Sequence, residues 1–94
     1  MIECMERRVK ADLKAAVRYR IRSKLSLRVL DLNEGGCLLE ARGWSARPDE
    51  RVLIRLPGLS EIAASIIWVE DHKAGVAFEE PLYGPVVEGF FEAA

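Results

Sequence analysis

The sequence predicts an all-β protein, a small barrel of six antiparallel strands followed by a short C-terminal α-helix. Three observations support this fold class. Apolar and polar residues alternate along six short segments, turn-forming residues separate those segments, and the pattern changes after Pro85. The chain has 94 residues, half of them hydrophobic, which suits one small domain with its own core. Closing the sheet removes the exposed edges that promote aggregation.

The first three strands are expected at residues 13–22, 25–31 and 37–42. In the first, every second side chain is apolar, and lysine and arginine fill most of the positions between them. This alternation is typical of a strand with one buried face. The residues expected to face inward are Leu13, Ala15, Val17, Tyr19, Ile21, Leu25, Leu27, Val29, Leu39 and Ala41.

The other strands follow a polar loop at residues 43–50 and are expected at 51–56, 61–70 and 75–80. Trp68 alternates with Ile62 and Ile66, so we expect it in the core. Trp44 lies in the polar loop, where it either folds back over the core or stacks on another molecule. The residues expected to be buried include Leu27, Val29, Ile54, Ile66 and Phe78.

The C-terminal segment, residues 84–93, is expected to form a helix packed on the sheet. Pro85 suits the first helical turn, and an apolar stripe follows it. Residues 1–8 are charged and hold few apolar anchors, so we expect a flexible N-terminal arm. The predicted organisation is therefore one domain over 1–94, with the arm, a barrel at 13–80 and the helix.

Charge is unevenly distributed, although the net charge is only −1. Arginines are concentrated in the first third of the chain and acidic residues in the last third, so a near-neutral total can hide a basic patch. Cys4 and Cys37 are too few for a disulfide framework, which favours reduced thiols and a cytoplasmic protein. We expect neither a signal peptide nor a membrane span.

Catalytic chemistry is hard to find in this sequence. His72 is the only histidine and lies in an expected turn, where a solvated side chain is the usual outcome. Two distant cysteines and one histidine lack the spacing of a metal site. Cys37 lies in an apolar strand and is expected to be a buried thiol. We therefore expect neither an enzyme nor a bound metal or cofactor.

The segment "DLNEGG", residues 31–36, follows the second expected strand. Alone, it indicates a tight turn in which Asp31 and Asn33 cap backbone groups. It stands, however, between an N-terminal arginine segment and "IIWVEDHKAGVAFEE", a late hairpin. This ordered set, from about residue 5 to residue 80, resembles the PilZ domain. That family comprises the six-stranded split barrels of bacterial cyclic di-GMP receptors, so the resemblance implies a PilZ-like split barrel.

The family carries R-x-x-x-R near its start and D/N-x-S-x-x-G after its second strand. Asp31, Asn33 and Gly36 fall on the second motif, with asparagine in place of the usual serine. Arg8 falls on the second arginine of the first motif, whereas the first arginine falls on Cys4. The arginine motif is therefore degenerate. Arg7 is the adjacent substitute for the missing arginine, and Lys10 is a poorer one.

The resemblance implies a division of roles in ligand binding. Arg7 and Arg8 would fork onto a phosphate or a guanine edge, or stack on a purine. Asp31 and Asn33 would face the guanine N–H donors. Gly36, together with Gly35, would allow a sharp turn and a close approach of the ligand.

Three functions follow from these observations. The first is a cyclic di-GMP receptor or adaptor that signals when the ligand orders the N-terminal arm. The second is a barrel that no longer binds nucleotide and acts as a protein-interaction module with an unknown partner. The third is nucleic-acid binding through Arg18, Arg20, Arg22 and Arg28. The acidic isoelectric point and the lack of aromatic residues interleaved with those arginines disfavour the third.

Overall fold

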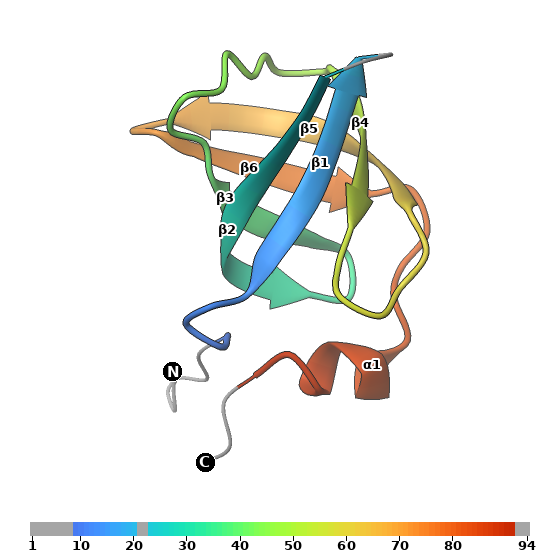
Figure 1. Ribbon diagram of the computed structural model, residues 1–94. Coiled ribbons are helices and arrows are strands. Elements are labelled where there is room, and N and C mark those ends of the chain that lie inside the picture. Colours follow the sequence, from blue (N-terminus) through green and yellow to red (C-terminus); the bar gives the residue numbers. More distant parts are fainter. Residues whose placement is uncertain (1–8, 21–22, 92–94) are drawn as a thin grey trace, which may run out of the picture.

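The structure, a computed structural model, describes residues 9–20 and 23–91. Six antiparallel strands form a closed barrel in the order β1-β2-β3-β6-β5-β4, with one short helix beneath it (Figure 1). The expected fold class is confirmed. The elements are β1 (Lys14–Arg20), β2 (Ser23–Asn33), β3 (Gly36–Glu40), β4 (Arg51–Arg55), β5 (Ile62–Glu70), β6 (Lys73–Phe78) and α1 (Gly84–Glu88).

Tight hairpins and one longer connection produce this strand order. Asn33 pairs with Gly36 to close the β2–β3 hairpin, and Glu70 pairs with Lys73 to close the β5–β6 hairpin. The loop at residues 41–50 then carries the chain from β3 to β4, which pairs with β1 and closes the barrel.

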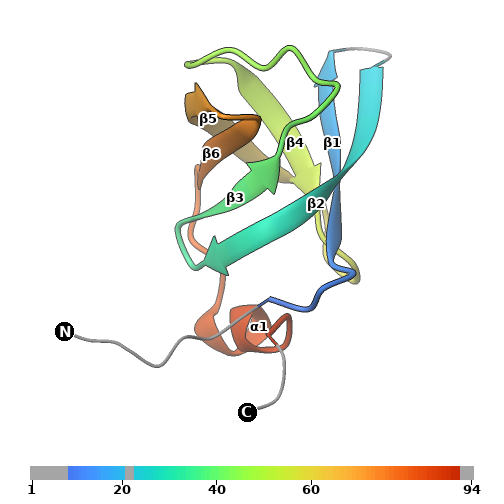
Figure 2. The ribbon, with the colours of Figure 1, turned by 90° about the vertical axis from the view of Figure 1, so that its left-hand side faces the viewer.

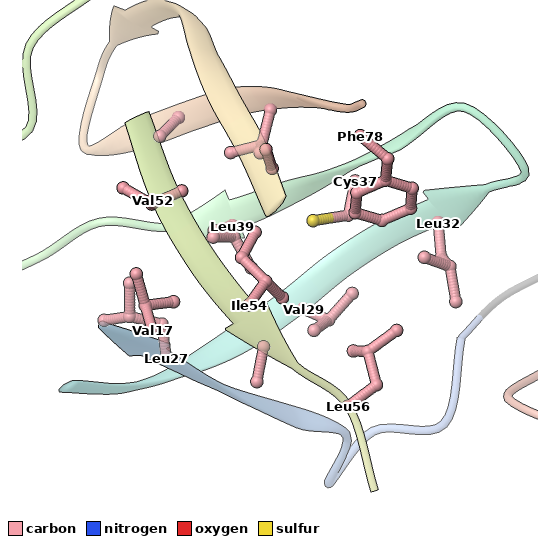
Figure 3. Close-up of a cluster of buried hydrophobic side chains, with 14 of the residues drawn as sticks. Val17, Leu27, Val29, Leu32, Cys37, Leu39, Val52, Ile54, Leu56 and Phe78 are labelled. Carbon is pink, nitrogen blue, oxygen red and sulfur yellow. The ribbon is translucent and has the colours of Figure 1, made fainter. Parts of the chain in front are cut away.

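The core fills the interior of the barrel with aliphatic side chains from all six strands. Leu39, Ile54 and Ile66 are completely buried, and Figure 3 shows Leu39 and Ile54 among the side chains that fill the interior. The burial predicted for Leu27, Val29, Ile54, Ile66 and Phe78 is confirmed. Cys37 is buried as expected.

Trp44 takes the first of its two alternatives and folds back over the core. Its side chain is buried, and its ring centroid lies 5.6 Å from that of Tyr19 at the end of β1. An aromatic pair at this distance contributes packing energy beyond its buried area. Trp44 therefore anchors the 41–50 loop onto the barrel.

The expectation that Trp68 lies in the core is wrong. Its side chain is 42% exposed. Ile66 pairs with Val76, but the next pair on the two strands is Trp68 with Gly75, so Ile67 is an extra residue in β5. Such a β-bulge breaks the two-residue alternation. Trp68 consequently lies on the outer face with Gly75.

The C-terminal helix lies across one end of the barrel (Figure 2). It ends at Glu88, earlier than expected. Hydrogen bonds of the i→i−3 type follow, such as Phe91 N–H to the Glu88 carbonyl, and Phe91 then bridges to Val9. This tighter winding and the bridge are incompatible with a continuing α-helix. Within the described part of the chain, no helix has the length and apolar character needed to cross a bilayer.

Candidate functional site

An open groove of about 510 Å³ lies on the outer surface of the barrel. Four neighbouring strands, β2, β3, β6 and β5, contribute to it. The predicted site residues of the β2–β3 hairpin all line this groove, together with exposed apolar residues of β5. Its lining includes Asp31, Asn33, Gly35, Gly36, Ile67 and Trp68.

Asp31 reaches the groove because β2 also contains a bulge. Val29 pairs with Leu39, but the next pair is Asp31 with Leu38, which leaves Leu30 as an extra residue. Without it, Asp31 would share the inward face of Val29. The bulge therefore turns Asp31 outward onto the same face as Asn33, and Leu32 between them is buried.

Both polar side chains of the motif are partly engaged by the local backbone. Asp31 Oδ1 accepts a hydrogen bond from the Leu32 N–H at 2.9 Å, and Asn33 Oδ1 accepts one from the Gly35 N–H at 2.8 Å. This confirms that they cap backbone groups. Within residues 9–20 and 23–91, the second oxygen of Asp31 and the amide nitrogen of Asn33 have no partner. Two residues of the groove lining therefore retain one available acceptor and one available donor.

The β2–β3 turn is also held by the segment that leads to α1. The Phe78 N–H donates to the Gly35 carbonyl at 2.9 Å, and the Leu82 N–H donates to the Glu34 carbonyl at 2.8 Å. Backbone hydrogen bonds on both turn residues restrict their motion. The motif is consequently presented on a fixed hairpin rather than on a free loop.

Gly36 is required for a different reason from the one expected. Neither Gly35 nor Gly36 has a positive φ, so the turn does not depend on glycine conformations. A Cβ on Gly36 would lie only 2.1 Å from the Val76 carbonyl oxygen on β6, whereas one on Gly35 would lie 3.6 Å from Asn33 Oδ1. Gly36 allows β6 to approach closely, and Gly35 has room for a side chain.

Trp68 and Ile67 form the opposite wall of the groove, which the sequence analysis did not find. A Cβ on Gly75 would lie 2.3 Å from Trp68 Nε1, so the indole lies against the bare backbone of Gly75. Ile67 beside it is 54% exposed. The sequence did contain one clue to this wall. Gly75 lies within the last strand, and a glycine inside a strand often marks a place where another group packs closely against the backbone.

The predicted arm lies outside the described residues, and with it Arg7, Arg8 and Cys4. The chain is described from Val9, which follows Arg8 in sequence. Val9 bridges Phe91, and the Lys10 N–H donates to the Phe90 carbonyl at 2.9 Å. This contact lies at the end of the barrel that α1 covers, where the β2–β3 turn also lies (Figure 2). The base of the arm and the hairpin motif thus share one end of the barrel.

In the described part of the chain, neither Cys37 nor His72 belongs to a second reactive site. Burial raises the pKa of the Cys37 thiol to about 12, so it carries almost no reactive thiolate at neutral pH. His72 is exposed in the Asp71–His72 turn, with a φ of 62°. No group of three potential metal ligands occurs within residues 9–20 and 23–91.

Comparisons with known proteins agree with this geometry. Residues 5–83 match the family described as PilZ domain. A search of curated proteins gave no match. The match covers most of the chain, including the bulged β2, the hairpin motif and both strands of the late hairpin. The chain belongs to the PilZ domain family.

Proposed function

We propose that this domain is a receptor for cyclic di-GMP and performs no catalytic step. PilZ domains are ligand-binding and adaptor modules, and this chain matches the family over residues 5–83. The observation that carries the proposal is the groove itself. It has an available carboxylate oxygen and an available amide on one wall and an exposed indole on the other.

The polar wall of the groove suits the edge of a guanine. The free oxygen of Asp31 can accept a hydrogen bond from the guanine N1–H or N2–H groups, which are donors. Since Asn33 Oδ1 is engaged by Gly35, the amide nitrogen of Asn33 is the group left for the ligand. That NH₂ group is a donor, so it can replace the serine hydroxyl in contacting an acceptor such as a phosphate oxygen.

The apolar wall and the arm complete the proposed site. The Trp68 indole offers an aromatic surface to a purine. Arg8, with Arg7 as substitute for the arginine missing at Cys4, would contact a phosphate or a guanine by charge-assisted hydrogen bonds. Ligand binding would order the arm over the groove and change the surface presented to a partner protein. In this proposal the protein works in the bacterial cytoplasm.

A second candidate function is a protein-interaction module that does not bind nucleotide. The observation that favours it is Cys4, which stands at the place of the first arginine of R-x-x-x-R. A thiol supplies neither the positive charge nor the paired donors of a guanidinium.

Calorimetric titration with cyclic di-GMP tests the proposal, with Asp31→Asn and Asp49→Asn as a matched pair. Both variants neutralise an exposed aspartate, but Asp49 lies in the 41–50 loop, outside the groove. Asp31→Asn keeps an oxygen for the Leu32 N–H and places a donor where guanine also has donors. We expect it to lose about 1.5–3 kcal/mol, roughly ten- to hundredfold in affinity. Asp49→Asn should bind as the wild type does.

Arginine variants separate the two candidate functions. Arg8→Ala should weaken binding by a similar factor, and Arg7→Ala should match it only if Arg7 replaces the missing arginine. Cys4→Arg restores the motif and should tighten binding. If neither the wild type nor folded Cys4→Arg binds cyclic di-GMP at high micromolar concentration, the receptor proposal is wrong and the interaction module is favoured.

A further inference from the structure

The outer face of β4, β1 and β2 carries a cluster of cations, which we call the cationic face. Its members are exposed or half-exposed and come from three adjacent strands. Cross-strand register brings them together, since Ala16 on β1 pairs with Ser26 on β2 and Arg55 on β4. The cationic face comprises Lys14, Arg18, Lys24, Arg28 and Arg55.

Like charges lie directly opposite one another on this face. Lys14 pairs with Arg28, and Arg18 pairs with Lys24. Opposite charges at such positions stabilise a sheet, whereas like charges destabilise it. The chain contains 15 acidic residues, yet none occupies these positions. Lysine also protects exposed strand edges, but this barrel is closed and has none here. We therefore expect the two like-charge pairs to lower the stability of the sheet rather than to raise it.

Most of the positive charge on the cationic face is not neutralised by the part of the chain that the structure describes. Arg18 pairs with Glu61 at 2.7 Å. For Lys14, Lys24, Arg28 and Arg55, residues 9–20 and 23–91 supply neither an ion pair nor a side-chain hydrogen bond. Four cations are thus available to an external anion.

The side chains at the centre of the cationic face are short or uncharged. Ala16 and Ser26 form the middle cross-strand pair, and the half-buried Leu53 pairs with Arg18 from β4. Short side chains at the centre allow another backbone to approach closely. A centre poor in charge with a charged rim is also the usual anatomy of a protein interface.

We infer that the cationic face docks an acidic segment of a partner protein. Charge complementarity supplies the attraction, and carboxylates reaching the four unpaired cations would relieve the cross-strand repulsion. A nucleic acid is the less suitable occupant. This face is the side of a multi-stranded sheet, not the helix or two-stranded ribbon that fits a duplex groove, and its described part carries no aromatic side chain on which bases could stack. This inference is independent of cyclic di-GMP binding, because none of the five cationic residues lines the groove, which takes only residues 31–33 from β2.

The test is an NMR titration of the full chain with a short poly-glutamate peptide. We expect amide shifts at Ala16, Ser26, Arg28 and Arg55, and weaker binding as salt rises, because the attraction is electrostatic. Parallel titrations use a single-stranded oligonucleotide and vesicles of anionic phospholipid. Tighter binding of either one to the cationic face would overturn the assignment of a protein partner, as would peptide-induced shifts confined to other surfaces.

Arg28→Glu and Lys73→Glu form the matched variants. Both change the net charge by the same amount, but Lys73 lies on β6, at the opposite side of the barrel. Arg28→Glu should bind the peptide roughly tenfold more weakly or worse, because a carboxylate then faces the peptide. It should nevertheless melt at a higher temperature, since the introduced carboxylate would pair with Lys14. Equal weakening by Lys73→Glu, or unchanged binding by Arg28→Glu, would overturn the inference.

Discussion

The two outer walls of the barrel differ in shape, charge and strand regularity. The wall formed by β2, β3, β6 and β5 is hollowed into a groove that polar and aromatic residues border. The wall formed by β4, β1 and β2 has the short side chains of Ala16 and Ser26 at its centre and cations around them. From Lys14 to Arg18 the β1–β2 register is unbroken, whereas β2 and β5 each contain a bulge beside the groove.

This difference shows how a small barrel builds a site. Regular pairing keeps alternate residues on one face, so β1 from Lys14 to Arg18 and β2 from Lys24 to Arg28 present their alternate side chains outward. One extra residue in β2 turns Asp31 outward, and one in β5 turns Trp68 outward. The two bulged strands thereby bring a carboxylate and an indole to opposite walls of one groove.

The largest expected effect comes from the core that both walls share. Ile54 on β4 and Ile66 on β5 are each completely buried. Ile54→Ala and Ile66→Ala should each lower the free energy of unfolding by about 2–5 kcal/mol, because each leaves a cavity. Chemical denaturation measures both. If only one of the two variants lowered the free energy of unfolding, the two walls would not share one cooperative core.

A smaller effect should separate the two glycines of the hairpin. Gly36→Val places a side chain against the Val76 backbone and should destabilise the fold by about 1–3 kcal/mol or more. Gly35→Ala has room and should change the free energy of unfolding by less than about 0.5 kcal/mol. Thermal unfolding compares them. Equal effects would contradict the close approach of β3 and β6.

The smallest effect concerns the cationic face. Lys14→Glu places a carboxylate opposite Arg28 and should raise the free energy of unfolding by about 0.2–1 kcal/mol. The double variant Lys14→Glu, Arg28→Glu restores a like-charge pair and should lose that gain. Denaturation of the single and double variants gives the coupling free energy of the pair. A coupling of zero would mean that the like charges cost no stability.

Alternation in the sequence was enough to predict the fold and the regular wall. Leu27, Val29, Ile54, Ile66 and Phe78 are buried as the pattern indicates. Alternation fails to predict which residues face inward beyond a β-bulge. The extra residue reverses the faces of the residues that follow it, and the alternation pattern does not show where it is inserted. Trp68 was therefore misplaced in the core.

The hairpin motif was recognisable, but its physical basis was not. Gly36 was expected to be glycine because of the turn. The structure gives another reason: a side chain there would collide with the Val76 carbonyl on β6, a strand far along the chain. Long-range pairing of this kind cannot be read from a local window. Trp44 likewise needed the structure, because its partner Tyr19 is distant in sequence.

The two tryptophans offer the most direct test of the claim that the groove binds cyclic di-GMP. Trp68 borders the groove, and Trp44 is buried beside Tyr19. In an NMR titration with cyclic di-GMP, the indole N–H signal of Trp68 should shift together with the backbone amides of Asn33 and Gly35. The Trp44 indole and the Ala16 amide on the cationic face should stay unchanged. An unshifted Trp68 signal at saturating ligand, or shifts confined to the cationic face, would contradict the account.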